Sequence, residues 1–281
     1  MDTLVTTDWL NQHLGDADLV LLDCSVTTQQ LENGGIQNVS GRANYEQGHI
    51  PGAGFADLKG DLCDADSPIE FAVPSAEQFC RAMGELGVGD RSRVVLYDNS
   101  FSAWAARVWW MLRWVGFDRA AILNGGLRVW RDEQRPLSTD PVDRARQQLT
   151  PRPRPELIAD HDEVLASIDD EKVRLVDTMP EAHYRGEMVM YGRPGHIPGA
   201  VSISGVNLID ESGRYRPDAE LATMHSGDHN TRAITYCGGG ILASSSAFVM
   251  TRLGFKNVAV YTASLQEWAS DPDNPLVIDH S

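Results

Sequence analysis

The apolar residues of this chain fall into short runs that alternate with longer amphipathic segments. The runs are four or five residues long and lie at 19–23, 94–97, 120–123, 173–177, 233–236 and 258–261. Short, nearly continuous apolar runs bounded by turn residues are typical of parallel strands that are buried on both faces. Their alternation with helical segments predicts an α/β fold, in which helices cover both faces of a parallel sheet.

This pattern occurs twice along the chain. The hexapeptide GHIPGA stands at Gly48–Ala53 and again at Gly195–Ala200, and each copy follows one of the apolar runs. Further along, a Gly-Phe pair is followed by a tryptophan fourteen residues after the glycine, at Trp130 in the first copy and Trp268 in the second. So many matched positions indicate an internal duplication. We therefore predict two domains of the same fold.

A proline-rich stretch separates the two copies. Prolines occupy alternate positions in Thr150–Pro155. Because proline lacks an amide N–H, it cannot continue a helix or a central strand, and the stretch should be an extended linker. We predict an N-terminal domain over residues 1–140, a linker over 141–155 and a C-terminal domain over 156–281.

Composition narrows the classes of partner. The chain has 40 acidic and 24 basic residues, which give a formal net charge of −16. A surface this acidic repels phosphate backbones and anionic lipids, so we expect neither a nucleic acid nor a membrane partner. The N-terminus has no basic region followed by a long apolar stretch, which predicts no signal peptide and a cytoplasmic protein.

The four cysteines differ in their surroundings. They form no CxxC pair and no Cys/His spacing typical of a metal site, and a disulfide framework is not expected in a chain of this kind. Cys24 and Cys80 are interpreted as small buried hydrophobic residues. Cys63 lies between Asp61 and Asp64 in the acidic segment DLCD, whose charge should raise the thiol pKa and disfavour reactivity.

Cys237 stands where the two copies diverge. The run at 94–97 is followed by Asp98, whereas the run at 233–236 is followed by Cys237 and three glycines, Gly238–Gly240. Ligands of α/β proteins bind at the carboxyl ends of strands, and glycines allow successive N–H groups to form an anion-binding nest before a helix. Such a nest should lower the thiol pKa and stabilise an anionic adduct such as a persulfide. The alternative is a glycine-rich turn with a bystander cysteine.

With these features the chain resembles the rhodanese superfamily, specifically the tandem-domain thiosulfate and 3-mercaptopyruvate sulfurtransferases. The resemblance covers nearly the whole chain. It is carried by both GHIPGA motifs, RVWWMLRWVGF at Arg107–Phe117, LNGGLRVW at Leu123–Trp130 and YCGGGI at Tyr236–Ile241. It implies two rhodanese-like domains, of which the first is non-catalytic with Asp98 at the cysteine position, and the second carries sulfur on Cys237.

The chemistry that this resemblance implies has two steps. The Cys237 thiolate takes the outer sulfur of thiosulfate or the thiol sulfur of 3-mercaptopyruvate, and the persulfide then passes it to cyanide or a thiol. No cofactor or metal is implied. The residues expected to bind the persulfide and the substrate at the loop are Gly238, Gly239, Gly240, Ile241 and Leu242.

The loop sequence leaves the sulfur donor open. Thiosulfate-preferring relatives usually carry CRKGVT and mercaptopyruvate-preferring relatives CGSGVT, whereas this chain has CGGGIL. It lacks basic residues that would pair with the thiosulfate dianion, and it lacks a serine at Gly239. The missing charge and Gly238 lean toward mercaptopyruvate, and Leu242 replaces the familiar threonine.

Three further residues are candidates to bind the donor. Arg193 keeps the RPG context of the relatives. The resemblance therefore implies that its guanidinium binds a carboxylate or sulfonate of the donor through two hydrogen bonds, as a clamp. Relatives often place a second arginine where Met179 or His183 stands. His183 and Arg185 are the candidates to replace it, and the alternative for Arg185 is a solvated surface arginine.

Two candidates lie in the first copy. His49 and His196 occupy the same place in the two GHIPGA motifs, also in the copy that has Asp98 at the cysteine position, which favours a structural hydrogen bond that fixes the loop against the sheet. The resemblance to mercaptopyruvate enzymes keeps His49 as a possible site residue. Trp104, six residues after Asp98, is a candidate to wall the substrate pocket, and core packing is its alternative.

Two rival functions are to be compared with the residues of this loop. Phosphatases that share this fold need an arginine closing the loop after the cysteine, and here the next arginine is Arg252, which disfavours that activity. A relay module that hands persulfide sulfur to a partner protein would have the same sequence. The expected partners are therefore a small-molecule sulfur donor and acceptor, with a thiol protein as a further possible acceptor.

Overall fold

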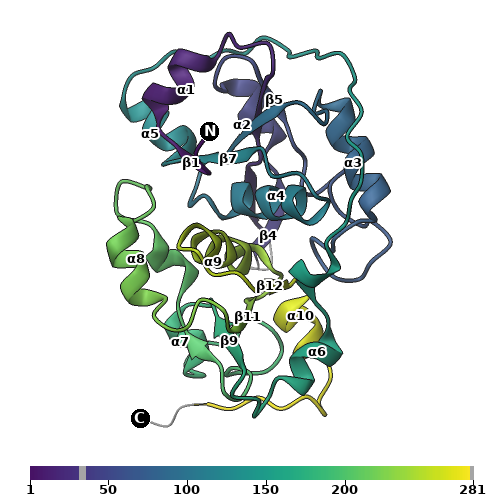
Figure 1. Ribbon diagram of the computed structural model, residues 1–281, viewed down its shortest axis with the longest axis vertical. Coiled ribbons are helices and arrows are strands. Elements are labelled where there is room, and N and C mark those ends of the chain that lie inside the picture. Colours follow the sequence, from purple (N-terminus) through teal and green to yellow (C-terminus); the bar gives the residue numbers. More distant parts are fainter. Residues whose placement is uncertain (32–35, 279–281) are drawn as a thin grey trace. The chain divides into compact units, whose positions relative to one another are not determined.

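The computed structural model describes residues 1–31 and 36–278 and divides the chain into two compact units (Figure 1). Unit 1 comprises Met1–Asp66, Val73–Pro153 and Glu211–Arg214. Unit 2 comprises Ser67–Ala72, Arg154–Asp210 and Tyr215–Ser281. The segment Ser67–Ala72 thus belongs to unit 2 and Glu211–Arg214 to unit 1, which the sequence pattern did not predict. The proline-rich stretch has no helix or strand between residues 141 and 154.

Unit 1 is built on a five-stranded parallel sheet. Its strand order is β1 (Leu4–Val5), β7 (Ala120–Leu123), β6 (Arg93–Tyr97), β2 (Leu19–Asp23) and β5 (Ala53–Phe55). The helices of this unit are α1 (Thr7–His13), α2 (Arg42–Gln47), α3 (Ala76–Glu85), α4 (Ala103–Trp114) and α5 (Gly126–Asp132). An antiparallel pair, β3 (Val26–Gln30) and β4 (Ile36–Ser40), is added between β2 and α2.

Unit 2 repeats the same sheet. Its parallel strands follow the order β8 (Ile158–Ala159), β12 (Val258–Tyr261), β11 (Arg232–Tyr236), β9 (Val173–Asp177) and β10 (Val201–Ser202). Its helices are α6 (His161–Ala166), α7 (Glu181–Tyr184), α8 (Asp218–Met224), α9 (Ile241–Arg252) and α10 (Ser264–Trp268), with single 3₁₀ turns at Pro155–Leu157 and Gly205–Leu208. Each strand has its counterpart at the same place in the unit 1 sheet, so the predicted duplicated α/β fold is confirmed.

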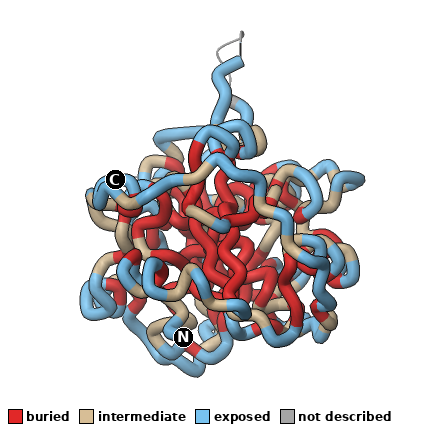
Figure 2. The backbone as a smooth tube through the Cα atoms, turned by 90° about the horizontal axis from the view of Figure 1, so that it is seen from above, coloured by how far each residue is buried: buried red, intermediate tan, exposed pale blue. Residues whose placement is uncertain are grey.

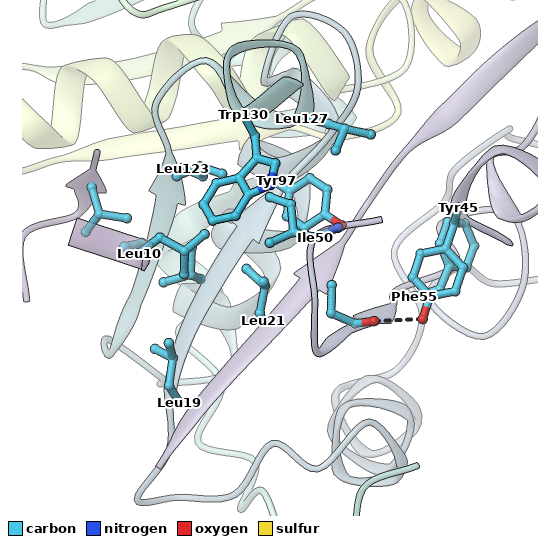
Figure 3. Packing of buried hydrophobic residues seen from close by; sticks show 14 residues of the cluster. Leu10, Leu19, Leu21, Tyr45, Ile50, Phe55, Tyr97, Leu123, Leu127 and Trp130 are labelled. Atoms are coloured by element: carbon cyan, nitrogen blue, oxygen red, sulfur yellow. Dashed lines mark hydrogen bonds between the residues drawn. The ribbon is translucent and has the colours of Figure 1, made fainter. Parts of the chain in front are cut away.

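The apolar runs form the cores, as their pattern predicted. All five residues of β2 are buried, and exposed positions concentrate in the connecting segments (Figure 2). In unit 1 the side chains of Leu10, Leu21, Tyr97 and Trp130 belong to one cluster (Figure 3). The buried indole N–H of Trp130 donates to the carbonyl of Pro136 at 2.8 Å, so this large side chain leaves no polar group unsatisfied. Within the described residues, no helix is long and apolar enough to cross a membrane.

Each GHIPGA histidine holds the end of a short helix. The ring Nδ1 of His49 lies 2.9 Å from the carbonyl oxygen of Tyr45, and the two rings stack with centroids 4.0 Å apart. In unit 2 the ring Nδ1 of His196 lies 2.8 Å from the carbonyl oxygen of Tyr184, and the rings stack at 3.6 Å. Both histidines therefore make a structural hydrogen bond, as their repetition predicted, but the partner of each is a carbonyl of the preceding helix and not the sheet.

A buried aspartate ends a central strand in each unit. Asp23 and Asp177 are 1% and 0% exposed. Each carboxylate accepts an N–H from two residues further on, at 2.8 Å from Ser25 and 2.7 Å from Met179. Burial raises the pKa of each carboxyl to about 6, although these hydrogen bonds oppose it. Both groups therefore ionise only at a cost to folding.

This cost predicts a pH-dependent stability. The folded pKa of about 6 lies above the unfolded value, so the folded chain binds more protons between roughly pH 4 and 6 and its free energy of unfolding falls as pH rises through that window. For Asp177 the fall amounts to up to about 3 kcal/mol. Asp177→Asn should remove the part of this fall that lies between pH 4.5 and 7.5, about 2 kcal/mol, in urea unfolding compared at those two values, and the exposed Glu171→Gln should not. An unchanged pH dependence in Asp177→Asn would contradict the assignment.

Candidate active site

Cys237 is the first residue after β11, in the loop that leads into α9. Its side chain is almost wholly covered, and the residue is 3% exposed. The amide N–H of Cys237 donates to the hydroxyl of Ser264 at 3.1 Å, and its carbonyl accepts the N–H of Leu265 at 3.1 Å. The start of α10 therefore fixes the backbone of the cysteine.

The loop after Cys237 presents a row of backbone amides at the start of α9. Gly240 begins α9 in the left-handed conformation, with φ +80°, which glycine adopts without the strain of a side chain. In the part of the chain that the structure describes, no acceptor is found for the amide N–H groups of Gly238, Gly239, Gly240, Ile241 and Leu242. Unpaired N–H groups at a helix N-terminus attract negative charge. The loop is thus suited to an anion beside Cys237.

The corresponding loop of unit 1 already holds an anion. Asp98 follows β6 as Cys237 follows β11, and the carbonyl of Asp98 accepts the N–H of Leu127 at 3.0 Å, as that of Cys237 accepts one from α10. The Asp98 carboxylate accepts the N–H groups of Ser100 at 2.9 Å, Ser102 at 3.1 Å and Ala105 at 3.1 Å. In the copy that has Asp98 at the cysteine position, the chain's own carboxylate therefore satisfies the loop amides.

Tyr191 lies directly on the cysteine loop. A Cβ built at Gly238 would stand 1.9 Å from the phenol oxygen of Tyr191, so this oxygen fills the space of the missing side chain. Burial and the negative charge of Cys237 raise the pKa of Tyr191 to about 12, which keeps the phenol protonated. Sequence reasoning missed this residue, because it comes from an irregular segment without a motif.

Gln266 lies on the same loop from another side. A Cβ built at Gly239 would stand 2.2 Å from the Nε2 of Gln266. The backbone N–H of Gln266 donates to the carbonyl of Gly238 at 2.9 Å, and its Oε1 accepts the N–H of Glu70 at 2.8 Å. Gln266 thereby joins the loop to the segment Ser67–Ala72. It too was missed, since nothing in the sequence marks which glutamine reaches the loop.

Tyr191 and Gln266 also border a cavity of about 290 Å³ within unit 2. The other residues that line it are Pro68, Ile69, Gly192, Leu265, Ala269 and Ser270. None of these side chains is charged. A cavity of this volume suits a small molecule.

The predicted arginines are engaged elsewhere. The guanidinium of Arg193 donates at 2.8–3.4 Å to backbone carbonyls at and beyond the end of α10, those of Trp268, Ala269, Asp271, Pro272 and Asn274. This network gives Arg193 a structural role and argues against the clamp expected from its RPG context. Arg185 pairs with Glu181, one helical turn away, and its side chain is 46% exposed. That arrangement fits the alternative of a surface arginine.

His183 contacts Tyr191, which lies on the cysteine loop. The residue is 1% exposed, and neither ring nitrogen has a hydrogen-bond partner among the described residues. Its ring meets that of Tyr191 edge-on, with centroids 6.1 Å apart. Burial lowers the pKa of His183, so the ring is neutral at neutral pH and does not supply the charge of the absent arginine.

The remaining candidates lie in unit 1. Trp104 is buried in the first turn of α4, with its ring 6.4 Å from that of Phe101. A contribution of Trp104 or His49 to the site stays a prediction.

Cys80 is buried as predicted, and burial raises its pKa to about 12, whereas partial burial raises the pKa of Cys63. Cys24 is fully buried.

Comparison with known proteins agrees with this architecture. The model of the Rhodanese-like domain matches residues 6–133 and 160–271. Thiosulfate/3-mercaptopyruvate sulfurtransferase 2 of Arabidopsis thaliana is 32% identical over 98% of this chain and 86% of its own length. The 3-mercaptopyruvate sulfurtransferase of Escherichia coli (strain K12) is 31% identical over 97% of this chain and 96% of its own.

Solved structures show the same fold. The crystal structure of SseA from Escherichia coli, described with the rhodanese fold of the 3-mercaptopyruvate enzymes, superposes with a TM-score of 0.83 at 29% identity and covers 94% of this chain and 99% of that one. An anaerobic ergothioneine biosynthesis enzyme from Chlorobium limicola, at 24% identity, shares the fold with a TM-score of 0.82 over 99% of this chain and 71% of that one. With the domain model matching both halves, this chain belongs to the family of proteins built from rhodanese-like domains, in its two-domain form.

Proposed function

We propose that the protein is a sulfurtransferase that carries sulfane sulfur as a persulfide on Cys237. The sulfur comes from a small anionic donor, thiosulfate or 3-mercaptopyruvate, and goes to a thiophilic acceptor such as cyanide or a thiol. The observation that carries the assignment of Cys237 is its loop, in which five successive amides lack an acceptor within the described chain, whereas Asp98 fills the equivalent loop of unit 1.

The activity class follows from the relatives. The Arabidopsis thaliana and Escherichia coli proteins are named sulfurtransferases, and they align with nearly the whole chain at more than 30% identity. The predicted sulfurtransferase class is thereby confirmed. The assignment of residues 156–281 as the catalytic domain, and of 1–140 as the non-catalytic one, is part of the proposal and rests on the Cys237 and Asp98 loops.

The proposed reaction has two balanced steps. The Cys237 thiolate attacks the outer sulfur of thiosulfate or the thiol sulfur of 3-mercaptopyruvate, and a new sulfur–sulfur bond forms. The donor's S–S or C–S bond to that sulfur breaks, and its electron pair leaves on sulfite or on the enolate of pyruvate. The nucleophilic acceptor then attacks the outer sulfur of the persulfide, and the cysteine leaves as thiolate. The free amides from Gly238 to Leu242 stabilise the negative charge that Cys237 and its adduct carry.

A thiol protein is the alternative acceptor. The apolar residues Met188, Val189 and Met190 are 46%, 56% and 53% exposed, and they directly precede Tyr191, which lies on the cysteine loop. A partner protein could cover them while it receives the sulfur. Turnover with small thiols much slower than turnover with a thiol protein such as reduced thioredoxin would favour the relay.

The proposal is tested by kinetics and intact mass. We expect turnover with at least one of the two donors, and a gain of about 32 Da, one sulfur atom, when donor is added without acceptor. Peptide mapping should place the added sulfur on Cys237, and cyanide should remove it. Turnover without an adduct, or an adduct confined to another cysteine, would refute the proposal.

A further inference from the structure

Two polar side chains from other segments occupy the space that side chains at Gly238 and Gly239 would fill. The phenol oxygen of Tyr191 stands within 1.9 Å of a Cβ at Gly238, and the Nε2 of Gln266 within 2.2 Å of a Cβ at Gly239. Neither glycine can take a side chain unless these groups move. The two glycines and the two polar groups are therefore matched to one another, and the polar groups come from other segments of unit 2.

The Tyr191 hydroxyl and the Gln266 carboxamide each have a hydrogen-bond donor available for a ligand. No hydrogen-bond partner of the Tyr191 hydroxyl is found within residues 1–31 and 36–278. The Oε1 of Gln266 accepts the Glu70 N–H at 2.8 Å, which fixes the orientation of the carboxamide, while its Nε2 makes only a long contact of 3.4 Å with the Glu70 carbonyl. An amide nitrogen has two N–H groups, so one remains for a ligand.

The donors that the described residues gather at the loop are neutral. They are backbone amides, a phenol and a carboxamide, and the two candidate arginines are held by backbone carbonyls and by Glu181. The carboxylate of Glu70 adds negative charge near Tyr191. Removing an ion from water costs far more for a double charge than for a single one, and neutral donors return less of that cost than cations do. This surrounding suits a singly charged anion.

Resting on the proposed function, we infer that Tyr191 and Gln266 bind the anionic end of the sulfur donor as neutral hydrogen-bond donors and thereby select a singly charged thiol acid, such as 3-mercaptopyruvate, over doubly charged thiosulfate. Both side chains remain chemically unchanged during transfer. Their role is to bind and orient the substrate, with the glycines keeping the space for them.

The test compares kcat/KM for both donors across matched variants. The wild-type chain should prefer 3-mercaptopyruvate. Tyr191→Phe and Gln266→Leu should each lower kcat/KM for that donor about tenfold, mainly through KM, because each removes one hydrogen bond to a charged group. Gln266→Lys should shift the ratio of the two kcat/KM values about tenfold toward thiosulfate, since it adds a cation. Tyr215→Phe in unit 2 and Gln47→Lys on the surface of unit 1 are the controls, and melting temperatures check folding.

A second readout does not depend on transfer. Pyruvate should protect Cys237 from alkylation by iodoacetamide more strongly than sulfate does at equal concentration, and Tyr191→Phe should lose that protection. If the wild-type chain transfers sulfur from neither donor, the proposed function fails, whereas lost protection in Tyr191→Phe would still support the binding role. A wild-type preference for thiosulfate, or variants that keep both the donor ratio and the protection, would overturn this inference while leaving the sulfurtransferase assignment intact.

Discussion

Cys237→Ser should abolish sulfur transfer from both donors, with a loss of at least about a thousandfold in kcat/KM. A serine hydroxyl holds its proton at neutral pH and cannot form the sulfur–sulfur bond on which the proposed cycle depends. The substitution changes one atom in a residue whose backbone is fixed by Ser264 and Leu265, so we expect the fold to persist. The measurement is cyanide-coupled turnover together with intact mass after donor treatment.

The other cysteines provide the controls. Cys63→Ser and Cys80→Ser should retain most of the activity, because burial raises the pKa of both thiols and disfavours the reactive thiolate. Both variants should still gain one sulfur atom, whereas Cys237→Ser should gain none. Persistent turnover in Cys237→Ser, or a comparable loss in Cys63→Ser, would show that sulfur travels by another route.

Asp98→Ala should destabilise unit 1 by about 3 kcal/mol. Its carboxylate accepts three buried or partly buried N–H groups, those of Ser100, Ser102 and Ala105, and each amide left without an acceptor costs roughly 1–3 kcal/mol before water or local relaxation recovers part of it. Hydrogen exchange followed by mass spectrometry should show faster exchange in the peptides that cover residues 98–105, by roughly a hundredfold if the whole loss appears there.

Two variants separate this effect from a general loss of acidic charge. Asp98→Asn keeps one carbonyl oxygen as an acceptor and should lose less stability than Asp98→Ala. Asp132→Ala removes a carboxylate from the exposed surface of α5, where its contact with Arg128 is 3.9 Å long, and should change stability by less than about 0.5 kcal/mol. An Asp98→Ala chain that exchanges like the wild type would show that the loop amides need no internal anion.

The two loops have opposite tasks within one architecture. In unit 1 the amides after β6 are satisfied by a carboxylate that belongs to the chain, which makes the loop part of the folded core. In unit 2 the amides after β11 have no acceptor in the described chain. An anion that arrives with the substrate, or forms on Cys237, is what we propose to satisfy them.

The sequence by itself determined the fold and the place of Cys237 in it, whereas the role of Cys237 stays part of the proposal. The three longest strands of each sheet, the duplication and the position of Cys237 after β11 follow from local patterns, because apolar runs, turn residues and repeated motifs act over a few neighbouring residues. The shorter edge strands and the β3–β4 pair were not predicted. Only the tertiary structure decided that Tyr191 and Gln266 reach the loop. It also decided that Arg193 donates to the carbonyls beyond α10, and that Ser67–Ala72 packs with unit 2. A motif shows which donor a side chain carries, but which acceptor it meets depends on how segments distant in sequence pack, and that packing leaves no local signal.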